Sequence, residues 1–305
     1  MQAIYAFVQS NNSDLNKGEK DLLNSIEKTF ELYVWYLSLI SEIVDFAKKV
    51  QDDAKLKMLP TSDDLNPNTG FTDSKIALQL STNIQLQQII KNKKVSWQQE
   101  PELIKKIFLM IKTSDEYKLY LTTKEKTYKD ETTFWTNVFK NHLIEYEPLE
   151  YFFEDKSVFW VDDFEIVYIA VLKTIKSLKE SSNSSLALQP LYKDEIDDRE
   201  FVIKLFRETI LNSPEYEALI AKKTENWEVE RIALMDVLLM KMAMAEAVTF
   251  SNIPLKVTLN EYIELSKFYS TPKSKSFING ILDKLVFDFK QEGKINKIGR
   301  GLLEE

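Results

Sequence analysis

Large apolar residues recur at steps of three or four along the segment between residues 22 and 47. Such steps place side chains on one face of an α-helix, because its period is 3.6 residues. The pattern predicts one long helix from about 16 to 50, whose centre, LYVWYLSLI, is apolar on most sides and therefore buried. The positions that carry the pattern are Leu22, Ile26, Phe30, Tyr33, Leu37, Ile40, Val44 and Ala47.

Turn-forming residues are scarce, since the 305 residues include only 6 glycines and 8 prolines. Average usage of roughly 7% and 5% corresponds to about 21 and 15 in a chain of this length. Sandwiches, barrels and Gly-rich phosphate loops depend on such residues, so the composition argues against them and favours an all-α fold of helical bundles. Further helices are predicted at about 74–92, 130–143, 162–178, 195–211, 214–222, 229–249, 255–269 and 274–290.

Two of these helices contain residues that predict local structure. Ser213, Pro214 and Glu215 form a typical helix start, with Ser213 as the cap. Gly280 falls inside the last predicted helix, where a glycine costs about 1 kcal/mol relative to alanine. A glycine in such a position indicates close approach of another backbone.

The residue types exclude several classes of site. The chain has no cysteine and a single histidine, His142, which excludes thiol nucleophiles, disulfides, iron–sulfur clusters and sites built on several histidines. Two acidic pairs, Asp162/Asp163 and Asp197/Asp198, lie at predicted helix starts, where the helix dipole explains them without catalysis. Because nucleotide-binding and nucleophile motifs are also missing, we expect neither an enzyme nor a cofactor or metal site.

The sequence also bears on location. No apolar run approaches the roughly 18 residues that a membrane-spanning helix needs, and the N-terminus lacks the features of a signal peptide. We therefore expect a cytoplasmic protein without a membrane partner. The first ten residues, MQAIYAFVQS, have the apolar pattern of a helix whose start is missing, which predicts a truncated N-terminus.

The polar stretch SSNSSLALQP divides the chain and is a typical linker. The expected organisation is a first helix at 1–12, an additional helical domain at 13–180, a linker at 181–192 and a second helical domain at 193–300.

Two segments resemble each other at a shift of 67 residues, namely 134–175 and 201–242. At this shift Phe134 aligns with Phe201, and Trp160 aligns with Trp227. Two amphipathic helix pairs can match by period alone, so coincidence and duplication of a helical subdomain both remain open.

Charge is distributed unevenly along the chain. The formal charge of −8 argues against broad, non-specific nucleic-acid binding. The segment from 251 to 305 differs, with nine basic residues against seven acidic ones. Within it Lys273, Ser274 and Lys275 lie just before Phe277 at a predicted helix start. Lysines and hydroxyls there can bind phosphate because free N–H groups point outward, although a solvated helix start gives the same pattern.

Aromatic residues mostly fall at helical spacing, which is typical of a core. Phe250, Phe268 and Phe277 differ, because they lie near predicted helix ends or polar loops.

Residues 252–285 closely resemble the signature of the NusB family of bacterial transcription antitermination factors. Upstream, WEVERIALMDVLLMKMAMAEA resembles the preceding helix of the family, and Gln2-Ala3-Ile4-Tyr5 resembles its first helix. The resemblance covers about 193–300 and the first ten residues. The matching signature positions are Ile253-Pro254, Lys256, Asn260-Glu261, Ile263-Glu264-Leu265-Ser266-Lys267 and Phe277-Ile278-Asn279-Gly280-Ile281-Leu282-Asp283.

This resemblance implies an all-helical binding protein that makes and breaks no bond. Proteins of the family pair with NusE, a protein of the small ribosomal subunit, and together they bind the boxA element of nascent RNA. The assembly helps RNA polymerase to resist termination, chiefly in ribosomal RNA operons. Carried over residue by residue, the resemblance places Lys273, Ser274, Lys275 and Phe277 at the RNA-facing turn.

The same resemblance places Tyr5 and Asp236 where family members meet NusE. Structural roles stand beside these assignments, since Phe277 can be a core residue and Asp236 an ordinary surface acid. The chain also departs from the family: its arginine-rich N-terminal segment is absent here, and Lys273 stands at a position that is often acidic.

Two other functions are related to this resemblance. Some ribosomal RNA methyltransferases carry a NusB-like domain, but they need a catalytic cysteine and a Gly-rich cofactor loop, which this chain lacks. A helical protein–protein scaffold that has lost RNA binding is the stronger alternative, favoured by the acidic charge and the absent arginines.

Overall fold

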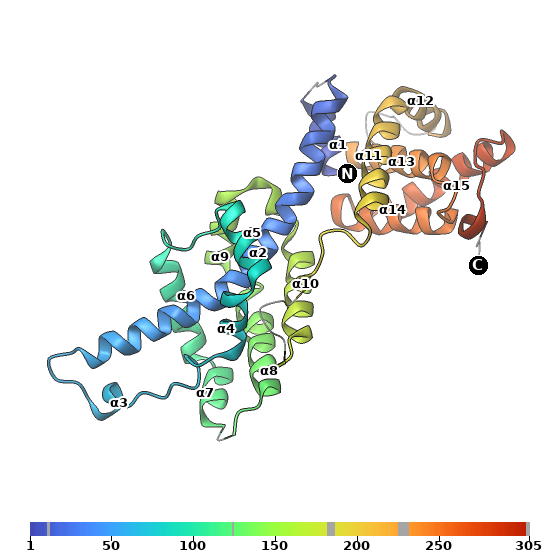
Figure 1. The fold of residues 1–305 in the computed structure, drawn as a ribbon. Helices are drawn as coiled ribbons and strands as arrows, with labels where there is room; N and C mark the ends of the chain where they lie inside the picture. The colour runs from blue at the N-terminus through green and yellow to red at the C-terminus, as the bar shows by residue number, and fades with distance from the viewer. Residues whose placement is uncertain (11–12, 124, 182–186, 225–231, 303–305) are drawn as a thin grey trace. The chain divides into compact units, whose positions relative to one another are not determined.

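A computed structural model describes residues 1–10, 13–123, 125–181, 187–224 and 232–302. Every regular element within these ranges is a helix, which confirms the predicted all-α class (Figure 1). The chain forms two compact units. The terminal unit consists of Met1–Asn24 and Tyr192–Glu305, and the central unit of Ser25–Leu191.

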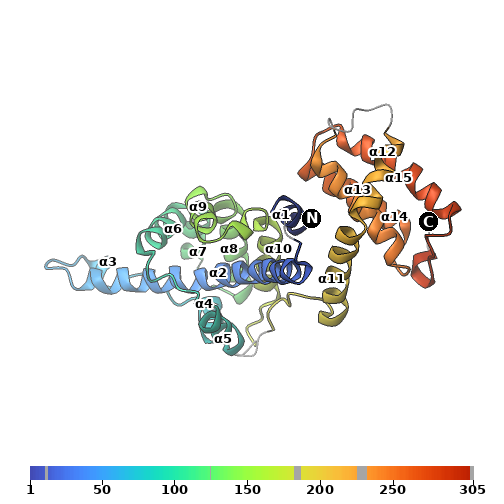
Figure 2. The same cartoon turned by 90° about the horizontal axis from the view of Figure 1, so that it is seen from above.

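The central unit is built around helix α2 (Leu15–Lys55), which confirms the predicted long helix. Its middle, from Leu32 to Ile40, is almost fully buried, as the apolar run predicts. In Figure 2, α8 and α9 lie on one side of α2 and α4 and α5 on the other. The other elements are α3 (Ser62–Leu65), α4 (Lys75–Thr82), α5 (Ile84–Lys93), α6 (Pro101–Thr113), α7 (Asp115–Thr122), α8 (Tyr128–Val138), η1 (Phe139–Leu143), α9 (Glu147–Lys156), η2 (Val158–Trp160) and α10 (Phe164–Ser177).

Polar groups buried in the central unit have partners, which is required because an unpaired buried group costs about 1–3 kcal/mol. Tyr33 Oη and Thr174 Oγ1 lie 2.6 Å apart and join α2 to α10. Trp97 Nε1 donates to Ser38 Oγ at 2.9 Å. The Trp35 ring packs edge-on against Trp97 at 4.8 Å between centroids, so these aromatics form core.

Two predicted helices of the central unit prove to be interrupted. The helix expected at 74–92 breaks at Asn83, whose side chain accepts from Leu86 N and caps α5. The helix expected at 130–143 changes to a π-helix at Phe139. There His142 Nε2 lies 2.9 Å from Glu116 Oε2, so the single histidine joins η1 to α7.

The terminal unit packs its helices around α13, which is buried along most of its length. The first residues of α2 belong to this unit, and Gly18 lies against the rings of Phe7 and Phe206. Beside this contact the Arg207 guanidinium donates to the Glu19 carboxylate, which joins α11 to the start of α2. The elements are α1 (Gln2–Gln9), α11 (Glu195–Leu211), α12 (Ser213–Lys223), α13 (Leu234–Thr249), α14 (Leu255–Tyr269), α15 (Ser274–Gln291) and η4 (Gly299–Leu302).

Two local predictions for the terminal unit are wrong. A Cβ at Gly280 would meet no atom within 4 Å, so no other backbone approaches this glycine in the described structure. Ser213 is the first residue of α12 rather than its cap, because Asn212 takes that position. The Ser213 hydroxyl instead accepts from Lys241 Nζ at 2.9 Å.

Within the described residues, the segments with internal similarity each include three α-helices, α8 to α10 and α11 to α13. Pro148 and Pro214 lie in the first turn of the middle helix in each case. Trp227 lies outside the described residues, so the pairing with Trp160 stays a prediction.

Candidate functional site

The turn between α14 and α15 carries the predicted RNA-facing residues. Lys273 and Lys275 are exposed on either side of the first residue of α15. Phe277 is half-buried and packs against the hydrophobic core of the terminal unit. We call Ser270 to Phe277 the α14–α15 corner. Its two lysines are exposed, whereas the Phe277 ring is shared between surface and core.

Ser274 has a different position from the one predicted. Its side chain is only 3% exposed, and its hydroxyl donates to Asp236 Oδ2 at 2.8 Å. Ser270 Oγ lies 2.9 Å from Ser274 Oγ, and Thr271 N donates to Ser274 Oγ at 3.2 Å. The hydroxyl is therefore fully engaged inside the corner, and the prediction that Ser274 faces RNA does not fit its burial.

Asp236 is also buried, with 4% of its surface exposed. Its carboxylate accepts from both Ser270 and Ser274 and thereby ties the start of α13 to the corner. A carboxylate removed from water needs such partners. Asp236 is thus neither a surface acid nor placed for direct contact with a partner, because its two oxygens point into the unit.

The sequence of α13 carries a signal for this burial. Its apolar stretch is interrupted by three charged residues, Asp236, Lys241 and Glu246, and all three are buried. Lys241 Nζ donates to Glu217 Oε2 at 2.6 Å as well as to Ser213. Charged residues inside an apolar run predict internal partners rather than surface contacts.

Glu246 is the third of these charges. It accepts a hydrogen bond from Tyr262 Oη at 2.9 Å, which links α13 to α14. Burial raises the pKa of the Glu246 carboxyl, because loss of water disfavours its charged form. The bond from Tyr262 opposes this rise only in part.

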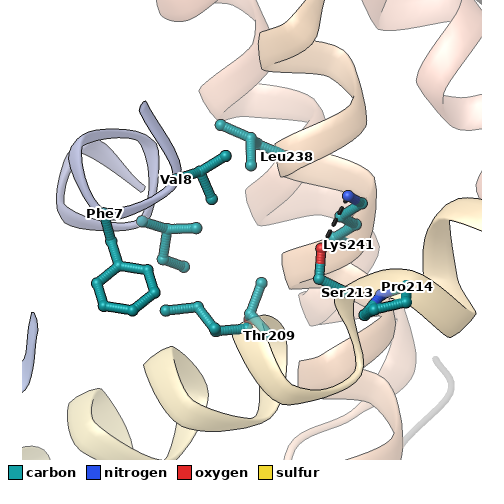
Figure 3. A pocket seen from close by; sticks show the side chains of 9 residues that line it. Phe7, Val8, Thr209, Ser213, Pro214, Leu238 and Lys241 are labelled. Carbon is teal, nitrogen blue, oxygen red and sulfur yellow. Dashed lines mark hydrogen bonds between the residues drawn. The ribbon is translucent and has the colours of Figure 1, made fainter. Parts of the chain in front are cut away.

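Tyr5, the other predicted partner contact, lies on α1 with 41% of its surface exposed. Val8 is three residues further and therefore lies on the same side of the helix. Val8 lines a pocket of about 340 Å³ between α1, α11, α12 and α13 (Figure 3). Figure 3 also shows Lys241 and Ser213 joined by their hydrogen bond at its edge. The pocket is lined by Ile4, Phe7, Val8, Thr209, Ile210, Ser213, Pro214, Leu238 and Lys241.

Tyr5, Lys273 and Lys275 are thus exposed on one unit, while Ser274 and Asp236 hold that unit together. Among the described residues, no three acidic or histidine side chains gather in a group that could hold a metal ion. In the same part of the chain, no helix is both long and apolar enough to span a bilayer.

Comparison with known proteins identifies the family. The model of the NusB family matches residues 166–287, from α10 to α15. A transcription antitermination protein NusB of Salinibacter ruber is 38% identical over 138 residues, which are 44% of this chain and 86% of that protein. No solved structure gives a match.

Two further relatives carry the same name. That of Chloroherpeton thalassium is 41% identical over 110 residues, which cover 36% of this chain and 52% of that protein. That of Alkaliphilus oremlandii is 35% identical over 99 residues, which cover 32% of this chain and 70% of that protein. The identity and the coverage of the first relative together show that this chain, although longer than its match, belongs to the NusB family.

Proposed function

We propose that this protein is a transcription antitermination factor that binds boxA-type single-stranded RNA together with NusE and supports ribosomal RNA transcription. The observation that carries the proposal is its membership of the NusB family, whose relatives are named transcription antitermination proteins. The protein acts by assembly, without a catalytic step or cofactor, and reaches RNA polymerase indirectly, in the cytoplasm.

The proposed RNA surface is the exposed side of the α14–α15 corner. Lys273 and Lys275 supply positive charge for phosphates, and their exposure leaves both ammonium groups open to a ligand. Phe277 presents only part of its ring, because the rest packs on the core. Its substitution by alanine is therefore expected to cost stability as well as RNA affinity.

The proposed NusE surface is the exposed side of α1. The side chains of Tyr5 and Val8 are 41% and 40% exposed. Ile4 and Phe7 of the same helix are buried in the core. Interfaces favour tyrosine because it combines apolar area with a polar end. The pocket beside Val8 supplies a depression next to this surface. Asp236 is left out of the proposed interface because of its burial.

The second candidate is a helical scaffold that binds proteins and has lost RNA binding. The net charge of −8 favours it, because RNA affinity depends on positive charge. The local excess of basic residues after 251 argues in the opposite direction.

Titration with labelled RNA separates the two functions. We expect the full chain to bind boxA-type RNA more tightly than a scrambled RNA of the same composition, and NusE to increase that preference. Absence of any preference in the presence of NusE, together with retained NusE binding, would establish the scaffold instead. Tyr5→Ala should weaken the effect of NusE while leaving binding of RNA alone unchanged.

A further inference from the structure

Phe268 lies in the last turn of α14, two residues before the α14–α15 corner, and its aromatic side chain is strongly exposed. It is 76% exposed, whereas Phe277 is half-buried against the core. No core cluster includes Phe268, and no ring contact involves it among the residues that the structure describes. Packing therefore does not explain a phenylalanine at this position.

Charged groups surround this ring on its own helix. Lys267 precedes it and forms an ion pair with Glu264. Glu264 and Phe268 are four residues apart and therefore lie on one face of α14. The exposed Phe268 ring thus shares its helix face with the Glu264 carboxylate, which the Lys267 ammonium group reaches.

Lys275 supplies a second exposed ammonium group, in the first turn of α15. The pKa of the Glu264 carboxyl is lowered, first by the hydrogen bond from Lys267 and also by the charge of Lys275. Only residues 270–273 separate the two helices, and Ser270 Oγ lies 2.9 Å from Ser274 Oγ, so the first turn of α15 lies close to the end of α14 that carries Phe268.

We propose that the Phe268 ring is a stacking platform for an unpaired RNA base, with Lys267 and Lys275 contacting the flanking phosphates. Stacking on an aromatic ring combined with positive charge is the typical means of binding single strands. A protein partner would favour a continuous apolar patch, but the next exposed large apolar residue on α14 is Val257, at 45%, about 16 Å earlier along the helix axis.

This inference rests on the proposed RNA-binding function, so the experiment must distinguish failure of that function from failure of the role given to Phe268. The probe is a labelled single-stranded boxA-type RNA, titrated into the full chain and into variants at residue 268. Binding by the unaltered protein tests the function, while the variants test the ring. Loss of stacking should weaken binding about 5- to 150-fold in Phe268→Ala. Phe268→Trp should bind at least as tightly as the unaltered protein.

Phe287→Ala is the matched control, because Phe287 is 63% exposed on α15 and lies outside the corner. Phe287→Ala should bind RNA as the unaltered protein does. The thermal unfolding temperatures of Phe268→Ala and Phe287→Ala should be the same. Phe268→Leu keeps apolar volume but has no π-face, so it should behave like Phe268→Ala. The inference is overturned if Phe268→Ala matches the control, if Phe268→Leu binds normally, or if Phe268→Ala weakens only NusE binding.

Discussion

The Ser274 hydroxyl donates a 2.8 Å hydrogen bond to Asp236 Oδ2 and so ties the first residue of α15 to the first turn of α13. Ser270 donates to the other carboxylate oxygen. One buried acid thereby holds both sides of the α14–α15 corner. This network lies inside the unit, between the exposed lysines of the corner and the start of α13.

Asp236→Ala should therefore destabilise the terminal unit. The change leaves the buried Ser274 hydroxyl and the partly buried Ser270 hydroxyl without their acceptor, and loss of a buried hydrogen-bond partner costs about 1–3 kcal/mol. Urea unfolding measures the effect, and Asp283→Ala on the exposed side of α15 is the control. Unchanged stability combined with loss of NusE binding would restore Asp236 as a contact residue.

Alanine at two glycines should act in opposite directions. Gly280 lies inside α15 with open space around it, so Gly280→Ala should stabilise by about 0.5–1 kcal/mol through helix propensity. A Cβ at Gly18 would lie 2.7 Å from Phe7 and 2.8 Å from Phe206, so Gly18→Ala should destabilise by about 1–3 kcal/mol. Thermal and urea unfolding of both variants measure the signs. Destabilisation by Gly280→Ala would mean that a partner or backbone lies closer than the structure shows.

Glu246→Gln should stabilise the protein in a pH-dependent manner. The pKa of Glu246 is raised by burial, so the folded state holds its proton more tightly than the unfolded state. The protonated carboxyl makes its full contribution to the free energy of unfolding below the ordinary carboxyl pKa, about 4.3. This contribution is lost as the pH rises through the pKa of Glu246 in the folded state. Glutamine cannot ionise and can still accept from Tyr262. Urea unfolding should show a higher free energy of unfolding for the variant at neutral pH and no difference near pH 4. An equal gain at both pH values would show that ionisation of Glu246 is not the cause.

Glu264→Gln should tighten RNA binding. The carboxylate now pairs with Lys267, and its removal releases that ammonium group and raises the positive charge beside Phe268. Fluorescence anisotropy at low salt should show the increase, which higher salt should reduce. Glu261→Gln, on an exposed position of the same helix, supplies the comparison. Weaker RNA binding by the Glu264 variant would place the RNA elsewhere.

Helix periodicity explains how much of the fold could be predicted. The middle of α2 is visible in sequence because its apolar positions repeat locally, and α14 begins and ends where its pattern does. The break at Asn83 is not visible in this pattern, because a single capping side chain ends the helix while the apolar spacing continues.

The site was harder to predict because its residues are defined by tertiary contacts. Ser274 and Asp236 are 38 residues apart, and nothing local shows that the serine turns inward. Phe277 and Phe268 are the same residue type and have similar neighbours in sequence. Phe277 is half-buried and Phe268 exposed only because of the rotation of each helix relative to the core.

The salt dependence of RNA binding tests the central claim, that the α14–α15 corner of this protein binds single-stranded RNA. Affinity for boxA-type RNA with NusE present should be measured across a range of salt for the unaltered protein and for the double variant Lys273→Gln/Lys275→Gln. Each lost phosphate contact should reduce the log–log slope by about 0.7, so the account predicts a slope shallower by about 1.4 and weaker binding. An unchanged slope and affinity in the double variant would contradict it.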